Sequence, residues 1–370
     1  MKKNNTVKQS SKQGGKGARS CPGSITIGMD LGDKTSRYCV VNGNGEVIKE
    51  GSVATSKKGM QQVFGGMRSS RMALEVGTHS PWVSRLLASF GHEVMVANAR
   101  QVKLISQSSR KTDKLDAQTL ARLGRVDPQL LRPIRHRSEQ AQQDLTQIRV
   151  RAALVEVRSG LVNTARGLAK ALGERLPSCD ADNLDVERMK SLPARVQELL
   201  RPLLEEVASL TERIQACDEQ IERIARSKYP ETELLQQVSG VGTLIALTFV
   251  LTVADAERFQ KSREVGCYLG LRPKRSDSGE SEPQLGISKE GDSYLRKLLV
   301  QGAQYILGQR GPDTDLQRWG RKLSARGGKN AKKRAIVAVA RKLAILLHRL
   351  WVTGEVYEPL RNSRAKQTAA

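Results

Sequence analysis

The chain has 370 residues, enough for two or three domains, and its 38% hydrophobic and 27% charged residues indicate that most of it folds. Its 62 Lys and Arg against 38 Asp and Glu give a formal net charge of +24, which favours nucleic acid as the partner over a small acidic molecule. A basic membrane-surface protein is the competing interpretation. No apolar stretch approaches the roughly 20 residues of a transmembrane helix or resembles a signal peptide, so a soluble protein inside the cell, without a membrane partner, is expected.

Residues 1–23 form a basic arm. Its first 20 residues contain six Lys or Arg and no Asp or Glu. This composition predicts a disordered segment that makes loose, salt-sensitive contacts with phosphates. A tail that only keeps the protein in solution explains the composition equally well.

Residues 24–138 have the pattern of an α/β domain. Strands are predicted at 24–31, 37–43, 46–55, 71–77 and 92–98. Helices are predicted over 81–90 and 114–123. An Asn-Gly run joins the second and third strands, as is typical of a hairpin. Three strands in a meander, followed by alternating helices and strands, are compatible with a ribonuclease-H-like core.

Four acidic residues in this domain stand where a metal-dependent nuclease needs them. Asp30 and Glu75 end two apolar strands, and Asp113 and Asp116 are spaced so that a helix projects both from one face. Phosphoryl transfer with two metal ions needs carboxylates that bridge and flank two Mg²⁺ about 4 Å apart, and strand, strand and helix can converge on such a site. Taken singly, each acid has a structural alternative as a cap. The flanking cations, expected to contact nucleic acid, are Arg110, Lys111 and Lys114.

The five cysteines and four histidines are dispersed, without a CxxC pair. Neither a zinc site nor a disulfide framework is therefore expected. Any bound metal is expected to be a hard cation with oxygen ligands, which agrees with the carboxylate quartet.

In residues 139–232 the strand pattern disappears and apolar residues keep heptad spacing in two stretches, 145–169 and 203–224. Pro177, Pro193 and Pro202 interrupt the middle of the region. The pattern predicts a helical hairpin or coiled coil that can serve as a dimer interface.

Residues 233–353 are predicted to be mainly helical, followed by a tail over 354–370. Gly240-Val241-Gly242 before an apolar helix is the turn of a helix-hairpin-helix, which can offer backbone N–H groups of Gly240 and Gly242 to a phosphate. A plain helix connector is the alternative. Further helices are predicted over 258–269, 291–307 and 330–351.

A Gly-containing loop in this region carries Ser276 and Ser278. A serine that attacks phosphate needs cations to stabilise the developing charge and a base to take its proton. The cations near these serines, expected to contact nucleic acid, are Lys274, Arg275 and Lys289. The neighbouring sequence contains no obvious base, and an ordinary surface loop is the structural alternative.

Taken together, the motifs MDLG, LEVGTHS, RKTDKLDA, SGVGTLIAL, CYLGLRPKRSDSG and LGISKEGDSYLRKLLVQGA resemble, in this order, the DEDD transposases of bacterial insertion sequences. These are serine-dependent recombinases related to the pilin-gene invertase, and some are guided by a bridge RNA. The resemblance covers residues 25–351. It implies a RuvC-like N-terminal domain, a coiled coil, and a C-terminal transposase domain, assembled as a homodimer or homotetramer in the bacterial cytoplasm and acting at the nucleoid.

The resemblance also implies roles for individual residues. Asp30, Glu75, Asp113 and Asp116 match the acids that bind Mg²⁺ in the family, and a serine of the C-terminal domain becomes joined to DNA. The family loop has two adjacent serines and a glycine; here the second aligns with Ser278. The first is replaced by Asp277, which leaves Ser276 as the other candidate.

The function implied is an RNA-guided DNA transposase that exchanges strands at element ends and target through a phosphoserine intermediate. Two other hypotheses remain open. One is a Mg²⁺-dependent, RuvC-like, structure-specific nuclease that uses water, and the other is a basic binding protein without catalysis, in which the acids are caps. Only the first predicts a covalent protein–DNA adduct.

Overall fold

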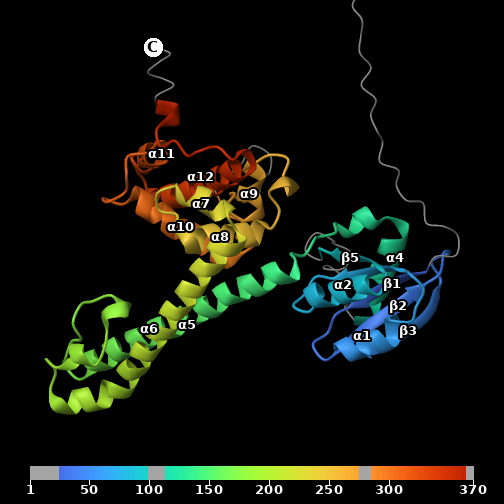
Figure 1. Ribbon diagram of the computed structural model, residues 1–370, viewed down its shortest axis with the longest axis horizontal. Coiled ribbons are helices and arrows are strands. Elements are labelled where there is room, and N and C mark those ends of the chain that lie inside the picture. Colours follow the sequence, from blue (N-terminus) through green and yellow to red (C-terminus); the bar gives the residue numbers. More distant parts are fainter. Residues whose placement is uncertain (1–24, 99–112, 275–284, 364–370) are drawn as a thin grey trace, which may run out of the picture. The chain divides into compact units, whose positions relative to one another are not determined.

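The computed structural model describes residues 25–98, 113–274 and 285–363, and the chain divides into two compact units, residues 1–137 and 138–370 (Figure 1). The whole basic arm, part of the tail, and Arg110, Lys111 and Arg275 therefore lie outside the described residues. Within those three ranges, no helix is long and apolar enough to cross a membrane.

Unit 1 is built on a mixed sheet with the strand order β3-β2-β1-β4-β5. The first three strands pair antiparallel, whereas β4 lies parallel to β1 and β5 lies parallel to β4. The strands are β1 (Thr26–Asp30), β2 (Thr35–Val41), β3 (Val47–Ala54), β4 (Arg71–Glu75) and β5 (Glu93–Ala97). All five lie where strands were predicted, and the three antiparallel strands followed by two parallel ones agree with the predicted α/β pattern.

Helices cover both faces of this sheet. On one face, α1 (Lys57–Phe64) and α2 (Ser80–Ser89) enclose a core that includes Ile27, Met29 and Phe64. On the other face, α4 (Asp113–Val126) packs on β1, β2 and β4, and a short 3-10 helix, Pro128–Leu131, follows it. Strand side chains alternate between the faces, so neighbours of Ile27 and Met29 along β1 point toward α4.

Gly28 is the point at which α4 comes closest to the sheet. A Cβ atom built on Gly28 would lie 2.1 Å from the carbonyl oxygen of Ala117 and 2.3 Å from the backbone nitrogen of Ala121. No side chain fits in that space. Glycine at this position therefore allows the backbone of α4 to rest directly on β1.

Unit 2 begins with a long antiparallel hairpin of α5 (Glu139–Ala171) and α6 (Ala194–Lys228), seen in green and yellow in Figure 1. Two short 3-10 turns, Ala181–Asn183 and Glu187–Met189, lie between the helices. Apolar residues spaced along both helices form two clusters, one of them including Val162, Leu200 and Val207. A helical hairpin is thus confirmed as an arrangement within the chain.

The prediction that Pro202 interrupts the helical region was wrong, because α6 runs through it. Proline removes one backbone hydrogen bond. Leu200 and Leu204 on either side of it are buried against the hairpin core, and this packing keeps the helix continuous.

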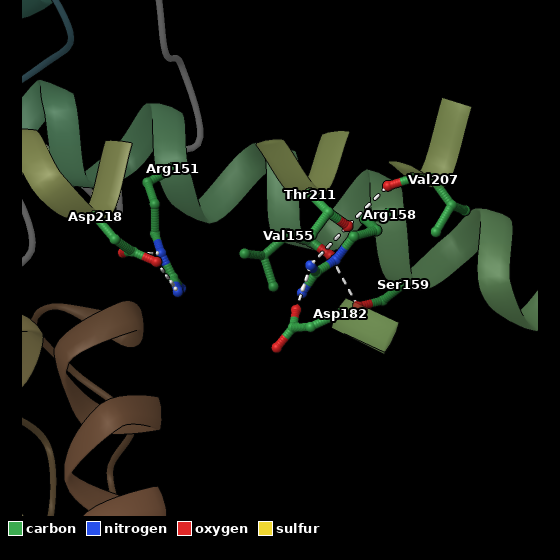
Figure 2. A network of polar contacts seen from close by, with 8 residues as sticks. All are labelled: Arg151, Val155, Arg158, Ser159, Asp182, Val207, Thr211 and Asp218. Carbon is green, nitrogen blue, oxygen red and sulfur yellow. Dashed lines mark hydrogen bonds and ion pairs between the residues drawn. The ribbon is translucent and has the colours of Figure 1, made fainter. Parts of the chain in front are cut away.

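Polar contacts join the two helices at their buried side (Figure 2). Arg158, of which 8% of the side chain is exposed, donates from Nη1 to Thr211 Oγ1 over 3.1 Å and pairs with Asp182 of the connecting turn. Two turns earlier along α5, Arg151 makes two hydrogen bonds to Asp218 of α6, of 2.8 and 3.1 Å. These pairs fix the register of α5 against α6.

The rest of unit 2 is a helical bundle around a single core that includes Phe249, Leu299 and Leu343. Its helices are α7 (Glu231–Gln236), α8 (Thr243–Val253), α9 (Arg263–Tyr268), α10 (Ser293–Leu307), α11 (Asp315–Ser324) and α12 (Ala331–Thr353), with a 3-10 turn over Ala256–Arg258. The helix predicted over 258–269 is shorter than expected, because it begins only at Arg263.

Candidate active site

Asp30 and Glu75 lie side by side at one edge of the sheet. The parallel register pairs Gly28 with Ala73 and Met29 with Leu74, so the next residues along β1 and β4 are these two acids. Gly28 and Ala73 both face α4, and alternation places residues two positions further on the same face. Both carboxylates therefore belong to the α4 side of the sheet, at the carboxyl ends of two adjacent strands.

Asp116 approaches the same edge from α4. A Cβ on Gly124 would lie 3.5 Å from Thr26, whereas Gly28 meets Ala117 and Ala121, so α4 runs antiparallel to β1. The first turn of α4, with Asp113 and Asp116, is consequently at the end of β1 that carries Asp30. Asp116 is buried, with 4% of its surface exposed. The side chain of Asp113 lies outside the described part of the structure.

This group of acids, which we call the acidic edge (Asp30, Glu75 and Asp116), has the chemistry that a hard divalent cation prefers. Within the described part of the chain, no three His, Cys, Asp or Glu side chains come together closely enough to hold a metal ion. The donor types and their placement on one edge fit Mg²⁺, and the side chains present do not form a closed cage. Asp113, as the fourth acid of the quartet, would add one more oxygen ligand from α4.

Two cations lie near the acidic edge, one of which sequence reasoning missed. Arg37 is directly opposite Asp30 in the antiparallel register of β1 and β2, so both side chains are on the α4 face. Lys114 forms an ion pair of 2.8 Å with Glu50 of β3, while 65% of its side chain remains exposed. Gln118 also bonds to Glu50, and these contacts hold the pKa of that carboxyl below its usual value.

Hydrogen bonds hold the loops that follow β1 and β4. After β1, Thr55 Oγ1 donates to the carbonyl of Gly32 over 2.9 Å, and its backbone nitrogen donates to Lys34. After β4, Ser80 Oγ donates to the carbonyl of Gly77 over 2.8 Å and lies 2.9 Å from His136 Nε2. Burial and the nearby Arg137 and Arg85 lower the pKa of His136, so this imidazole is neutral at pH 7.

His79 connects these two loops. Its Nδ1 accepts a hydrogen bond of 3.1 Å from Trp82 Nε1, and its Nε2 lies 3.4 Å from Asp33 Oδ1. Sequence reasoning treated His79 as one of four dispersed histidines. The feature of the sequence that could have indicated a role for His79 is its position four residues after Glu75, which ends a strand.

In unit 2, the segment with Ser276 and Ser278 lies outside the described residues. The stretches that flank it, residues 270–274 and 286–291, are described, and we call them the base of the serine segment. Pro273 and Ile287 form an antiparallel bridge, with hydrogen bonds of 2.9 Å from Lys274 N to Gly286 O and from Ser288 N to Arg272 O. The chain therefore leaves and returns at neighbouring points.

Two glycines keep this base compact. A Cβ on Gly270 would lie 2.2 Å from the carbonyl oxygen of Glu290, and one on Gly291 would lie 2.1 Å from that of Tyr268, and both residues have positive φ angles. Lys289 also has a positive φ, of 59°, and its backbone nitrogen donates to Gly270. The end of α9 thus meets the residues just before α10 through backbone contacts.

The hairpin α5–α6 contacts the same base. Arg149 of α5 pairs with Asp292, and its guanidinium lies 5.0 Å from the centre of the Tyr294 ring. Asp292 also caps α10 by accepting from Leu295 N over 2.8 Å. The start of α10 is therefore fixed by the hairpin as well as by its own cap.

Of the two glycines predicted to contact phosphate, Gly240 has a packing role. A Cβ on it would lie 3.0 Å from the carbonyl oxygen of Gly302 in α10, and its φ is +86°. Gly242 is exposed and precedes α8 without a side-chain cap. The turn joins a six-residue helix, α7, to α8.

Two transposase family models match the chain. One, of the DEDD transposases of the IS110 type and described as "Transposase", matches residues 27–173, and one described as "Transposase IS116/IS110/IS902 family" matches residues 232–317. The first match includes the acidic edge and all of α5. The second includes the base of the serine segment.

Several relatives align over most of their length. The transposase for insertion sequence element IS1111A of Coxiella burnetii is 28% identical over 90% of this chain and 90% of that protein. A probable family 20 transposase of Pseudomonas aeruginosa is 28% identical over 90% of this chain and 98% of that protein. The pilin gene-inverting protein of Moraxella lacunata is 29% identical over 30% of this chain and 33% of that protein.

The mixed sheet with its acidic edge, the helical unit that follows it, and the two matched models agree on one assignment. The chain belongs to the IS110/IS116 family of transposases, enzymes that cut and join DNA.

Proposed function

We propose that this transposase exchanges DNA strands through a covalent serine intermediate, with Ser278 as nucleophile and with Mg²⁺ held by Asp30, Glu75, Asp113 and Asp116. The observation that carries the proposal is the acidic edge: two acids end adjacent parallel strands, and a third, buried one begins the helix above them. Carboxylate oxygens are the ligands that Mg²⁺ prefers, and all three acids come from elements that meet at this edge.

Mg²⁺ bound there would neutralise charge on the scissile phosphate and favour an ionised hydroxyl. In the reaction we propose, Ser278 Oγ loses its proton and forms a bond to phosphorus, and the bond from phosphorus to a deoxyribose oxygen breaks. The departing oxygen takes up a proton. Attack by a second DNA hydroxyl reverses these steps and frees the serine, so no ATP is needed.

The base of the serine segment supports this role for Ser278. The Pro273–Ile287 bridge and the close contacts at Gly270 and Gly291 provide a rigid attachment for a nucleophile. Lys274 and Lys289 are exposed at the two ends of this base and are proposed to hold the DNA backbone.

The partners proposed are element-end and target DNA, a guide RNA, and further copies of the chain. The net charge of +24 suits both nucleic acids, and only 4% of the residues are aromatic, which favours backbone contacts over base stacking. Self-association is supported by exposed apolar residues of α5, namely Val150, Val157 and Leu168.

A covalent-trapping assay tests the mechanism. Purified protein is incubated with element-end DNA, the RNA encoded beside the gene and Mg²⁺, and products are separated on a denaturing gel. Wild type and Asp127→Asn, an acid of unit 1 away from the acidic edge, should give a DNA-linked band. Ser278→Ala and Asp30→Ala should give none, and Ser276→Ala should retain it.

The same assay separates the alternatives. Cut DNA without a linked band in wild type would favour the second candidate, a Mg²⁺-dependent nuclease that uses water, since the acidic edge alone would serve it. Loss of the band in Ser276→Ala but not in Ser278→Ala would move the nucleophile to Ser276. A linked band that forms without RNA would remove the guide RNA from the proposal.

A further inference from the structure

Unit 1 holds a hydrogen-bond donor that none of the assigned roles uses, in the loop that follows β4. It is the imidazole of His79, which is placed between Trp82 and Asp33. The side chain of His79 is 29% exposed and that of Asp33 is 89% exposed, so both are open to a ligand.

The protonation of His79 follows from its contact with Trp82. An indole N–H can only donate, so His79 Nδ1, 3.1 Å away, must accept. The proton of the neutral ring is then on Nε2, which faces Asp33. The two rings are nearly perpendicular, at 89°, with centres 6.1 Å apart, and Trp82 packs against the sheet core, so the imidazole is held in orientation as well as in tautomer.

The location of His79 follows from the sheet. Asp33 comes three residues after Asp30, and His79 comes four residues after Glu75, in loops that leave neighbouring ends of β1 and β4. Hydrogen bonds fix the path of each loop, from Thr55 after β3 to Gly32 in the first and from Ser80 to Gly77 in the second. The His79–Asp33 contact therefore spans the two loops at the edge where the acids are.

The contact with Asp33 is easily exchanged. At 3.4 Å it is long for a hydrogen bond, and an exposed pair of this kind contributes little to stability. A ligand with an anionic oxygen can therefore take the place of Asp33. Metal binding by His79 is disfavoured, because one ring nitrogen accepts from Trp82 and the other carries the proton.

We propose that His79 Nε2–H donates a hydrogen bond to a non-bridging oxygen of the scissile phosphate, and that Asp33 occupies this donor in the free protein. The inference rests on the proposed function of the acidic edge, since a phosphate served by these acids lies next to the two loops. It makes His79 a further catalytic residue, one that stabilises charge on phosphate oxygen as the bond to the nucleophile forms.

Single-turnover cleavage of element-end DNA tests the role. His79→Ala should lower the rate by about 10²-fold with the Kd for DNA within about twofold of wild type, because a preorganised donor to the transition state is lost. His79→Gln, whose amide N–H can reach a similar position, should recover about tenfold. Thr78→Ala, in the same loop and exposed, is the matched control and should cleave at the wild-type rate. Cleavage by His79→Ala at the wild-type rate would overturn the proposal.

Sulfur substitution identifies the atom that His79 contacts. With phosphorothioate DNA, the ratio of wild-type to His79→Ala rates should fall toward one for a single diastereomer, since sulfur accepts hydrogen bonds poorly. An equal ratio for both diastereomers and for unmodified DNA would place His79 elsewhere.

A measurement independent of cleavage separates this inference from the function it rests on. In full-length protein with ¹⁵N-labelled histidine, His79 should show the Nε2–H tautomer, and its Nε2 signal should shift when duplex DNA is added. The signals of His92 and His348, whose ring nitrogens bond within the core, should not shift. A Nδ1–H tautomer, or a His79 signal unmoved by DNA, would refute the inference even if the transposase mechanism holds. A shift in a protein that cuts no DNA would sustain it as a phosphate contact.

Discussion

The two units hold their functional residues by different means. In unit 1, the acids end strands whose register is fixed by pairing, and Gly28 sets the distance of α4 from the sheet. In unit 2, the described structure fixes the two ends of the segment that carries Ser278, through the Pro273–Ile287 bridge. Core packing therefore positions the proposed metal site, whereas a backbone hairpin attaches the proposed nucleophile.

The strongest test of this difference removes charge from the acidic edge without changing its shape. Asp116→Asn should lower strand cleavage by about 10³-fold, since residues that act together in one active site each cost nearly the whole activity. The protein should stay folded, because an amide replaces the carboxylate at equal volume. Cleavage rates and thermal unfolding measure the two effects. If Asp116→Asn cuts DNA normally, Asp116 is a structural residue of α4.

Packing at Gly28 is the next test. Gly28→Val should lower the free energy of unfolding by about 3 kcal/mol, because the new side chain must push α4 away from β1. Urea denaturation measures this loss. Gly66→Val is the matched control, since a Cβ there meets no atom within 4 Å. Equal stability of the two variants would mean that α4 is free to move on the sheet.

A buried carboxylate in unit 2 gives a smaller effect that depends on pH. Asp144 of α5, with 5% of its side chain exposed, accepts hydrogen bonds from Lys228 (3.0 Å), Tyr229 (2.8 Å) and Gln140 (3.1 Å). Burial acts to raise its pKa, but these hydrogen bonds outweigh burial and lower it. Asp144→Asn should cost about 2 kcal/mol at pH 7.

The sign of the pH dependence follows from the lowered pKa. The carboxylate of Asp144 stabilises the native state above its unfolded pKa of about 3.9, and this contribution is lost as the pH falls through the lower folded value. Urea denaturation at pH 7 and below pH 4 should show a steeper loss for wild type than for Asp144→Asn. Parallel pH profiles would contradict the assignment.

The smallest expected effect concerns Pro202, which is exposed inside α6. Pro202→Ala should raise the free energy of unfolding by about 1 kcal/mol, since alanine restores a helix hydrogen bond and this gain exceeds the lost restriction of the unfolded chain. Thermal unfolding measures the change. A loss of stability would show that α6 needs a bend at this point.

Much of unit 1 was predictable from the sequence because its elements have simple periods. Five apolar strands and the placement of Asp30 and Glu75 at strand ends follow from local pattern. The parallel register that makes these acids neighbours, and the close contact of α4 with Gly28, depend on residues far apart in the chain. The local sequence pattern therefore predicts neither the register nor the contact.

There are also physical reasons why some features of the structure were not predicted from the sequence. α1 has 8 residues and α11 has 10, so the helical spacing of their few apolar residues extends over too short a stretch to identify a helix from the sequence. The role of Pro202 was mistaken because packing on α5 outweighs local helix propensity. His79 was overlooked because its meaning depends on Trp82 and Asp33, which form a site only after β1 and β4 pair.

The backbone hairpin beneath the serine segment has a consequence for how the enzyme can change. The end of α9 and the residues that follow it contact the residues just before α10 at Gly270 and Gly291, so this packing does not require any particular sequence between the two ends of the hairpin. Insertions, deletions or exchanges within residues 275–284 would alter chemistry while the domain remains folded. Reactivity and foldability are thus encoded in separable stretches of chain, and the segment is a natural place to transplant variants between related enzymes.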